Sequence, residues 1–248
     1  MSQLQGSAPK GSYDSFFGTN ITPIGKWWVK TTNRLRLRLL MSSTPIGPDT
    51  VFLEIGPGRA GLGILAAQTT GCRLVAIEGS RTAVSLLREQ GVEVIEVLVP
   101  PIPWEESTVD LVVAINVIEH MPSVREAREF VTEALRVLRP SGLIVLGTGN
   151  ILDLGRFFFS DYTHTYPLSP QGIHWLLRDH GFDIVLTRLH VGPFFSPWLR
   201  RPVNWLGKLI PWRLISTVLT GLPDSPPWYK ALLSTRECIF VVGRKPEE

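Results

Sequence analysis

Cysteine is scarce in this chain, and its scarcity bears on where the protein works. The 248 residues include two cysteines, Cys72 and Cys238, and both stand in apolar runs typical of buried strands. Two such thiols are not the disulfide framework that a small secreted protein needs. The sequence therefore favours a reducing compartment, and we expect a cytoplasmic protein.

Long apolar runs are also missing. The N-terminal stretch MSQLQGSAPKGSYDSFFG has no apolar core of the signal-peptide type. The longest candidate for a membrane span, Leu209–Leu222, falls short of the roughly 18 residues that a spanning helix needs, and it contains Arg213. Hydrophobic residues nevertheless make up 44% of the chain, which is enough for the core of one large α/β domain or two small ones.

Charge of either sign is nearly balanced overall, but it is unevenly distributed. The formal net charge is +3. Basic residues outnumber acidic ones in residues 1–40 and again in residues 193–235, so the rest of the chain is acidic. The basic residues are Lys10, Lys26, Lys30, Arg34, Arg36 and Arg38 in the first segment, and Arg200, Arg201, Lys208, Arg213 and Lys230 in the second.

Short apolar runs that favour strands alternate with amphipathic stretches that favour helices. Strands are predicted at residues 51–55, 73–77, 92–97, 110–115, 143–147, 183–189 and 237–243, and the main helices at 60–68, 80–90, 123–138 and 169–182. The last helix should begin at a Ser169 cap followed by Pro170, and Pro140-Ser141-Gly142 should end the one before it. Such alternation predicts a doubly wound, mostly parallel α/β sheet.

The segment LEIGPGRAGLG, residues 53–63, joins the first strand to its helix and fits two cofactors. Its glycines spell G-x-G-x-x-G, the dinucleotide-binding pattern, but Glu54 also makes it E-x-G-x-G. An acid at that strand end would repel a pyrophosphate and would suit a ligand with an ammonium group. Glu78 ends the second strand, where either cofactor presents ribose hydroxyls. A tight strand-to-helix connection without a ligand is the structural alternative.

Four segments in order, LEIGPGRAG, VAIEGS, PWEESTVDLVVAINVIEHM and ALRVLRPSGLIVL, resemble class I S-adenosylmethionine-dependent methyltransferases, especially those of ubiquinone and menaquinone biosynthesis. The likeness implies a seven-stranded Rossmann-like sheet with an antiparallel last strand, and S-adenosyl-L-methionine as cofactor. It further implies that Glu54, Gly56 and Gly58 line the methionine end, that Glu78 holds the ribose, and that Asn116 lies beside the cofactor.

The chain departs from the family pattern at three places. Ala60 replaces the third family glycine, and Leu98 stands near the position where relatives place an acid for the adenine amino group, so adenine recognition is left unassigned. Some relatives bind a divalent metal with E-x-x-E-H, but here Asn116 replaces the first carboxylate before Glu119 and His120. We therefore expect no catalytic metal, although Glu119 and His120 remain suitable ligands.

Methyl transfer to an oxygen needs a base as well as in-line positioning. His120, after the fourth strand, is one candidate, and His164 in the loop SDYTHTYPLSP is the other, with Asp161 able to orient it. Similar D-x-T-H loops occur in related methyltransferases. Each histidine can equally serve to shape its loop through hydrogen bonds. The remaining histidines, His174, His180 and His190, are interpreted as structural or solvated.

Two other functions stay open. A nicotinamide-dependent oxidoreductase is disfavoured by Glu54, and no separate substrate domain follows the glycine loop. A non-catalytic binding protein on a methyltransferase-like fold is kept open by Leu98. Nucleic-acid methylation is not expected, because the fourth strand is followed by Asn-Val-Ile-Glu instead of the N-P-P-aromatic segment of base-amino methyltransferases.

The division of the single domain follows from its two basic segments. Residues 1–45 form an N-terminal cap segment, 46–192 and 236–248 form the core, and 193–235 form a lid inserted before the last strand. The lid carries Trp198, Trp205, Trp212 and Trp228, and Pro202 and Pro211 should break its helix into short pieces.

Tryptophan mixed with arginine and lysine is typical of segments that lie in a membrane interface. The stretch KWWVKTTNRLRLRLL in the N-terminal segment repeats this composition. Because the sixth strand should run parallel to the first, both segments should meet at the ligand edge of the sheet. We expect a small or lipid-linked acceptor and peripheral contact with the inner, anionic face of the membrane. A lid that packs on itself and touches no membrane is the alternative.

Overall fold

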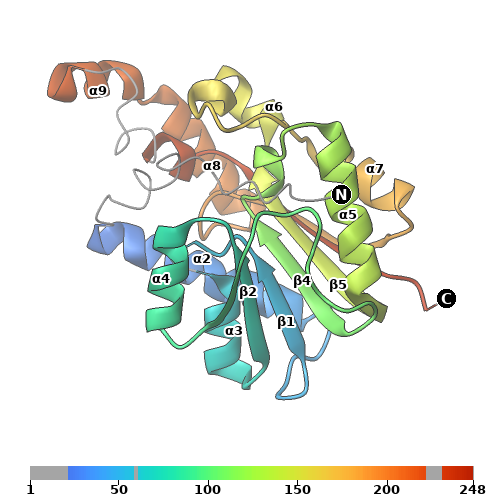
Figure 1. Cartoon of the computed structure of the whole chain (residues 1–248). Helices are drawn as coiled ribbons and strands as arrows, with labels where there is room; N and C mark the ends of the chain where they lie inside the picture. The colour runs from blue at the N-terminus through green and yellow to red at the C-terminus, as the bar shows by residue number, and fades with distance from the viewer. Residues whose placement is uncertain (1–21, 59–60, 222–230, 248) are drawn as a thin grey trace, which may run out of the picture.

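The computed structural model describes residues 22–58, 61–221 and 231–247, and one mixed β-sheet forms its centre (Figure 1). The strands are β1 (Val51–Ile55), β2 (Arg73–Glu78), β3 (Glu93–Glu96), β4 (Val109–Ile115), β5 (Leu138–Gly149), β6 (Asp183–His190) and β7 (Cys238–Arg244). They are ordered β3-β2-β1-β4-β5-β7-β6, and β7 is antiparallel to both of its neighbours while the other pairs are parallel. The predicted doubly wound, seven-stranded sheet with an antiparallel last strand is confirmed.

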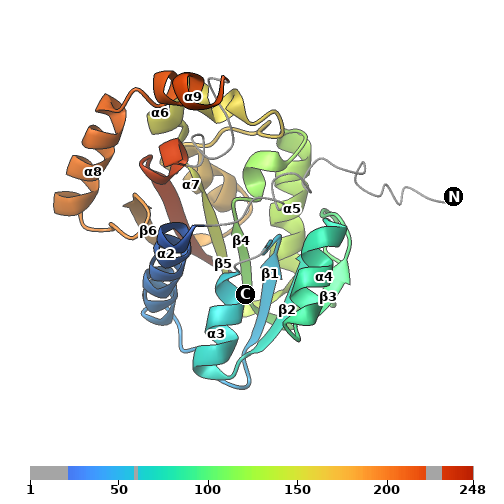
Figure 2. The same ribbon diagram turned by 90° about the vertical axis from the view of Figure 1, so that its left-hand side faces the viewer.

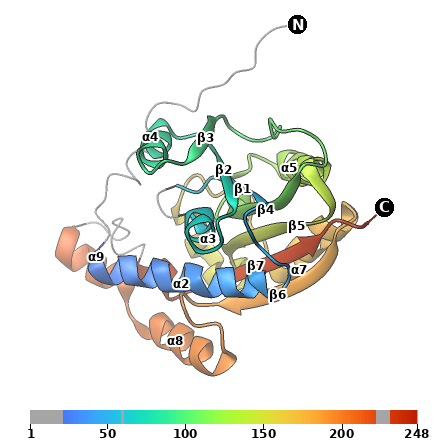
Figure 3. The same cartoon turned by 90° about the horizontal axis from the view of Figure 1, so that it is seen from below.

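Helices cover both faces of this sheet. Helices α5 (Val124–Val137) and α7 (Pro170–Asp179) pack on one face, and α2 (Pro23–Met41) and α3 (Leu62–Thr70) pack on the other. Figure 3 shows α2 lying beside α3, with α5 across the sheet. Side chains alternate along a strand, so in β1 Leu53 joins the core of the α5/α7 face while Phe52 joins the core of the α2/α3 face. Glu54 has the parity of Phe52 and therefore faces α2 and α3.

Local signals start the helices as the sequence predicts. The side chain of Ser169 accepts a hydrogen bond from the Gly172 amide at 3.0 Å, and Pro170 follows it at the first helical position. Ser80 caps α4 (Arg81–Glu89), and Ser123 caps α5. These side chains satisfy amides that have no partner inside the helix.

One boundary differs from the prediction. Helix α5 ends at Val137, and β5 begins at the next residue and continues through Pro140, Ser141 and Gly142. Ser141 has a φ of 62°, and a side chain at Gly142 would overlap the Arg139 carbonyl. The Pro-Ser-Gly segment therefore bends the start of a strand instead of ending a helix.

The lid helices follow β6, which points in the same direction as β1. They are α8 (Pro197–Leu209) and α9 (Trp212–Thr220), and Figures 1 and 2 show them grouped with α6 (Ile151–Leu154) at one end of the molecule. In the described residues, no helix combines the length and the apolar character that crossing a membrane requires.

The prediction that Pro202 breaks the lid helix is wrong, because α8 runs through it. Pro202 has no amide hydrogen, so it cannot bond the Trp198 carbonyl, but α8 continues through it without that bond. The break falls at Ile210 and Pro211, between α8 and α9, as predicted. Ala60, Trp228, Lys230 and the N-terminal Lys10 lie outside the described residues.

Candidate functional site

The glycine loop after β1 is built on two residues that tolerate a left-handed backbone. Gly56 has a φ of 58° and Gly58 a φ of 59°. The Gly56 amide donates to the Ile77 carbonyl at 2.8 Å, and a Cβ at Gly56 would lie 2.8 Å from Val117 Cγ2. Any other residue at position 56 would be strained in its backbone and would crowd Val117.

Glu54 lies beneath this loop and holds the start of α3. Its carboxylate accepts hydrogen bonds from the Leu62 amide at 2.7 Å and from the Gly63 amide at 2.8 Å. Burial raises the pKa of Glu54 to about 7, against the opposing effect of these two amides and of the Arg36 charge. A carboxylate at a helix N-terminus also stabilises the helix dipole. Contact of Glu54 with an ammonium group stays a prediction; what the structure shows is that Glu54 holds the start of α3.

Two glycines outside the predicted site make room for Glu54. A methyl group at Gly61 or at Gly63 would overlap the Glu54 carboxylate. In the sequence Gly61 is only the last glycine of the G-x-G-x-x-G pattern, and Gly63 lies outside that pattern. The signal was present, because a strand-end acid followed by glycines at the start of a helix is the pattern of a carboxylate bonded to that helix.

Glu78 holds the loop from the other side. It accepts from the Gly58 amide at 3.1 Å and from the Ser80 amide at 2.8 Å, and burial raises its pKa. We call Glu54, Gly56, Gly58 and Glu78 the glycine-loop side of the site. Its two carboxylates both point at the strand-to-helix turn, which is where an open α/β sheet binds its ligand.

Asn116 and Leu98 border this side. Asn116 is exposed, has a φ of 56°, and follows β4 directly before Val117, the residue that contacts Gly56. Leu98 lies over Gly79, where a side chain would overlap it, and remains half exposed. The position where relatives carry an acid is therefore an apolar shelf beside Glu78.

The two candidate base histidines come together although 44 residues separate them. Their rings lie 4.8 Å apart, His120 in the short 3₁₀ helix η1 (Ile118–His120) and His164 in the loop 161–169. His120 Nδ1 lies 2.9 Å from Thr163 Oγ1 and 3.3 Å from the Thr163 carbonyl. His164 Nδ1 lies 2.9 Å from the Phe158 carbonyl. A carbonyl only accepts, so both Nδ1 atoms carry the proton and both Nε2 atoms are lone-pair nitrogens in the neutral rings.

Asp161 orients this pair mainly through Thr163. Its Oδ1 accepts from the Thr163 hydroxyl at 2.6 Å and from the Thr163 amide at 3.0 Å, whereas His164 Nε2 is 3.8 Å from its Oδ2. Burial, aided by the His164 charge, lowers the pKa of His120 to about 4. His120 is therefore neutral at pH 7.

Glu119 completes what we call the histidine side, which comprises Glu119, His120, Asp161, Thr163 and His164. Its backbone carbonyl accepts from the amides of Thr165 and Tyr166, while its buried Oε2 has no hydrogen-bond partner among the described residues. Burial raises its pKa to about 7. Ligand atoms of Glu119, His120 and His164 lie within 4.8 Å of one another, which is a donor set that a divalent metal accepts. From the sequence no metal is expected, and His164, 44 positions from His120, could not be connected with this pair.

The other histidines bond within the fold. His174 contacts the Thr187 hydroxyl at 2.7 Å, His180 contacts the Leu176 carbonyl at 2.6 Å, and His190 contacts the Gly192 carbonyl at 2.9 Å. These partners fit the structural role predicted for them.

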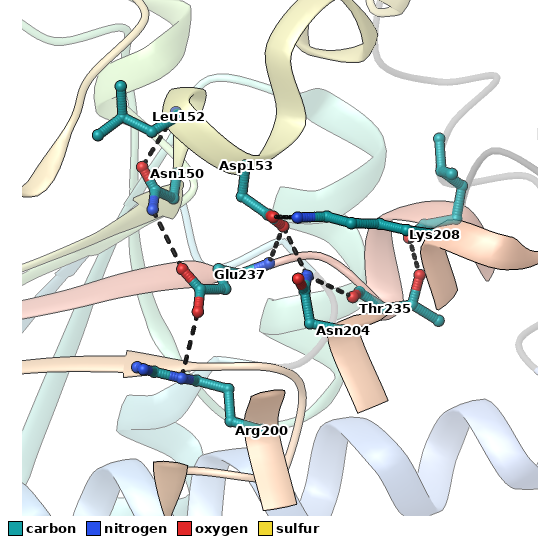
Figure 4. Close-up of polar contacts among 9 residues, drawn as sticks. Asn150, Leu152, Asp153, Arg200, Asn204, Lys208, Thr235 and Glu237 are labelled. Carbon is teal, nitrogen blue, oxygen red and sulfur yellow. Dashed lines mark hydrogen bonds and ion pairs between the residues drawn. The ribbon is translucent and has the colours of Figure 1, made fainter. Parts of the chain in front are cut away.

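Polar contacts around Asp153 and Glu237 tie the lid to the core (Figure 4). Asp153 of α6 pairs with Lys208, accepts from Asn204 Nδ2 at 2.7 Å and accepts from the Glu237 amide at 2.8 Å. Glu237 in turn pairs with Arg200 at 3.2 Å. Burial acts to raise the pKa of Asp153, but the bonds from Lys208, Asn204 and Glu237 outweigh it and lower that pKa. Arg200, Asn204 and Lys208 come from the inserted segment, and the sequence alone gave no partner for them.

Comparison with known proteins matches residues 53–146 to the family described as "Methyltransferase domain". A Mycobacterium tuberculosis (strain H37Rv) protein, named as a probable S-adenosylmethionine-dependent methyltransferase, is 34% identical over 146 residues. That alignment covers 57% of this chain and 52% of the relative, so the chain spans about half the length of the curated relatives it matches.

Solved structures share the fold. A protein of Galdieria sulphuraria, provisionally assigned as a sarcosine dimethylglycine methyltransferase, has a TM-score of 0.64 at 12% identity, over 87% of this chain and 86% of that one. Geranyl diphosphate methyltransferase in complex with S-adenosylmethionine has a TM-score of 0.60 at 16% identity, over 94% of each chain. The resemblance that the motifs suggested, to class I S-adenosylmethionine-dependent methyltransferases, is confirmed.

Proposed function

We propose that this chain, which carries the fold and a matching segment of the class I S-adenosylmethionine-dependent methyltransferases, transfers a methyl group from S-adenosyl-L-methionine to an oxygen of a small or lipid-linked acceptor. One observation carries the proposal: Glu54 and Glu78 both organise a glycine loop at the carboxyl edge of β1 and β2. Such a pair favours a ligand with ammonium and hydroxyl groups and disfavours a pyrophosphate, which makes a nicotinamide-dependent oxidoreductase the weaker alternative.

The residues that would hold the cofactor fit it. Gly56 and Gly58 themselves place no side chain on the loop, and Glu78 retains acceptor capacity beyond the contacts with the Gly58 and Ser80 amides. Glu54 would face the methionine end, Glu78 the ribose, and Asn116 would lie beside the cofactor. Leu98 on Gly79 offers adenine an apolar shelf. When bound, S-adenosylmethionine supplies a methyl group on a good leaving group, so the protein's task is positioning and proton transfer.

The histidine side would supply the base. His120 and His164 each keep Nδ1 protonated by a fixed acceptor, which leaves Nε2 as the nitrogen that can take the proton of an acceptor hydroxyl. Because His120 stays neutral down to about pH 4, its protonation would not limit activity near neutral pH. Glu119, His120 and His164 also fit a divalent metal, which would polarise the same hydroxyl. The proposal keeps a histidine base that works without a metal.

Binding assays separate this proposal from its alternatives. Titration calorimetry with S-adenosylmethionine, S-adenosylhomocysteine and NADH should show binding of the first two only. NADH binding without S-adenosylhomocysteine binding would favour the oxidoreductase. Binding of both adenosyl ligands, but no methyl transfer in a screen of lipid, quinone and sugar acceptors, would favour the non-catalytic binding protein.

The lid suggests the class of acceptor. Helix α8 exposes Trp198, Leu199, Trp205, Leu206 and Leu209, and α9 exposes Leu214, Val218 and Leu219. In α8, Trp198 and Trp205 are seven residues apart, as are Leu199 and Leu206, so they form one stripe. We call these eight residues the lid surface. Arg201 and Arg213 lie on the same two helices.

An apolar stripe with tryptophan and nearby cations matches the interface of an anionic bilayer. In this proposal the chain is one domain. Its cap is residues 1–45, its core residues 46–192 and 236–248, and its lid residues 193–235. It works in the cytoplasm and rests its lid on the inner face of the membrane, which would present an apolar or lipid-linked acceptor. A soluble acceptor under a lid that stays in water is the alternative.

Liposome flotation tests the membrane contact. The protein should float with vesicles that contain phosphatidylglycerol, float less with pure phosphatidylcholine, and lose binding as salt rises. A triple variant, Trp198→Ser, Trp205→Ser and Leu206→Ser, should stay with the soluble fraction. Trp175→Ser on α7 is the matched control, because Trp175 is as exposed as Trp205 but lies outside the lid. A wild-type protein that stays soluble at low salt with anionic vesicles would exclude membrane contact.

A further inference from the structure

Arg36 is a buried cation without an anionic partner in the described part of the chain. It lies on α2, and its side chain and backbone together are 9% exposed. Its Nη1 donates to Asn33 Oδ1 at 3.3 Å, its Nη2 lies 3.2 Å from His190 Nε2, and its Nε has no hydrogen-bond partner there. Arginine is rarely buried unless its charge is paired, since desolvating an unpaired charge is costly.

Both side chains that contact Arg36 are neutral. His190 Nδ1 lies 2.9 Å from the Gly192 carbonyl, so Nδ1 carries the proton and Nε2 accepts from Arg36. Burial, together with the charge of Arg36, keeps the pKa of His190 well below its usual value. Asn33 contributes an amide oxygen. The pair orients the guanidinium, and no anionic side chain pairs with it in residues 22–58, 61–221 and 231–247.

The position of Arg36 places this charge next to the glycine-loop side. Helix α2 packs beside α3, on the face toward which Glu54 points (Figure 3). The Arg36 charge is close enough to Glu54 to oppose the rise of its pKa, and it acts likewise on Cys238 at the start of β7. Arg36 and Glu54 are therefore neighbouring buried charges of opposite sign, but no ion pair joins them in the described residues.

We propose that Arg36 binds the carboxylate of the amino-acid end of S-adenosylmethionine, while Glu54 on the same face meets its ammonium group. The inference rests on the proposed function. An α-amino acid carries one charge of each sign two bonds apart, and a buried acid beside a buried, unpaired arginine is complementary to it. The planar guanidinium suits a carboxylate, and its unpartnered Nε is one of the two donors that a bidentate contact uses.

The proposal gives α2 a task in recognition as well as in packing. Without a ligand, Arg36 is oriented by Asn33 and His190 at the cost of an unpaired buried charge. With the ligand, that charge is compensated, so cofactor binding should favour the docked position of α2. The N-terminal cap and the glycine loop would then close on opposite ends of one zwitterion.

Three ligands and three variants test Arg36 by calorimetry. The ligands are S-adenosylhomocysteine, its decarboxylated analogue S-adenosyl-3-thiopropylamine, and 5′-methylthioadenosine, which lacks the amino-acid end. Arg36→Met should weaken S-adenosylhomocysteine about ten- to hundredfold and leave the other two ligands within twofold of wild type. Arg34→Met is the matched control, because Arg34 is an exposed arginine of the same helix, and it should change no affinity.

Arg36→Lys keeps the positive charge but loses the paired donors of the guanidinium. It should therefore weaken the binding of S-adenosylhomocysteine only, and by a smaller factor than Arg36→Met does. If Arg36→Met does not fold, Arg36→Lys takes its place in the test. Thermal unfolding of each variant shows whether it is folded. Equal losses for all three ligands, or no loss for S-adenosylhomocysteine, would overturn the role of Arg36 while leaving cofactor binding intact. A wild-type protein that binds none of the three would overturn the proposed function and, with it, this inference.

Discussion

The glycine-loop side and the histidine side lie at the same edge of one sheet, yet their polar groups are satisfied in different ways. Glu54 accepts from amides eight and nine residues ahead of it, and Glu78 accepts from an amide two residues ahead. His120 instead bonds Thr163, 43 residues away, and Thr163 bonds Asp161. The carboxylates of the first side bond backbone amides at the ends of two adjacent strands, and the second side is assembled through side chains of segments that are far apart in the sequence.

The difference also appears in the buried carboxylates. Burial raises the pKa of Glu54 and of Glu119 to about 7. Both oxygens of Glu54 accept from amides, whereas Glu119 Oε2 has no partner in the described residues. A buried acceptor without a partner carries a free-energy cost. Both oxygens of Glu54 are thus satisfied by the fold itself, whereas Glu119 on the histidine side retains capacity for a ligand, proton or metal.

The largest effect should come from breaking the glycine loop. Gly56→Val places a side chain at a φ of 58° and against Val117, so it should weaken S-adenosylhomocysteine by more than about a hundredfold in calorimetry. Gly47→Val is the control, because a Cβ at Gly47 has no neighbour within 4 Å. If Gly56→Val binds as wild type, the loop has been assigned to the wrong ligand.

Loss of the base should affect turnover and spare binding. His120→Gln or His164→Gln, whichever removes the base, should lower turnover about a hundredfold with cofactor affinity unchanged. The reason is that the two sides are built independently and only the histidine side would touch the acceptor proton. Methyl transfer and calorimetry on the same preparations separate the effects.

Full turnover in both histidine variants would mean that neither residue is the base, and would point to a nitrogen or carbon acceptor. A chelator arm adds a second distinction. Activity that survives EDTA supports the metal-free reading, whereas loss restored by a divalent cation would assign Glu119, His120 and His164 to a metal.

The free energy of unfolding of a Glu119→Gln variant tests the contrast between Glu54 and Glu119. Its pKa is about 7 in the folded protein against 4.5 in the unfolded chain, so the folded state holds the proton more tightly between these values. Glu119 therefore costs stability increasingly as pH rises from about 4.5 to 7, and fully above that. The variant's stability relative to wild type should rise by up to about 3 kcal/mol between pH 5 and pH 8, measured by urea unfolding.

A flat difference between the two proteins across that pH range would show that Glu119 is compensated at pH 8, for example by a bound cation. Repeating the unfolding with EDTA would then decide whether that cation is a metal.

The sequence could place the residues of the glycine-loop side together, while their roles toward a cofactor stay predictions. Glu54, Gly56 and Gly58 lie within five residues, and Glu78 ends the next strand, so strand periodicity places them at one edge. The contact between Arg36 and His190 joins residues 154 positions apart and could not be predicted. The partnership of Glu119 with His164 has the same cause. The prediction of a helix break at Pro202 was wrong because a proline removes one amide hydrogen bond from a helix without always ending it.

The smallest effect concerns the connection between the lid and the core at Asp153. Lys208 pairs with Asp153, which keeps its bonds from Asn204 and from the Glu237 amide when Lys208 is removed. Lys208 is itself nearly half exposed, so the pair is partly screened by solvent. Lys208→Met should therefore cost only about 1 kcal/mol in urea unfolding. Arg201→Met on the same helix, whose arginine forms no ion pair in the described residues, should cost less than about 0.5 kcal/mol.

Cofactor affinity should be unchanged in both variants, because the lid attaches beside Asp153 and α6 rather than at Glu54 and Glu78. A loss of cofactor affinity in Lys208→Met alone would mean that the lid position is coupled to the glycine-loop side, and that the two sides are not independent.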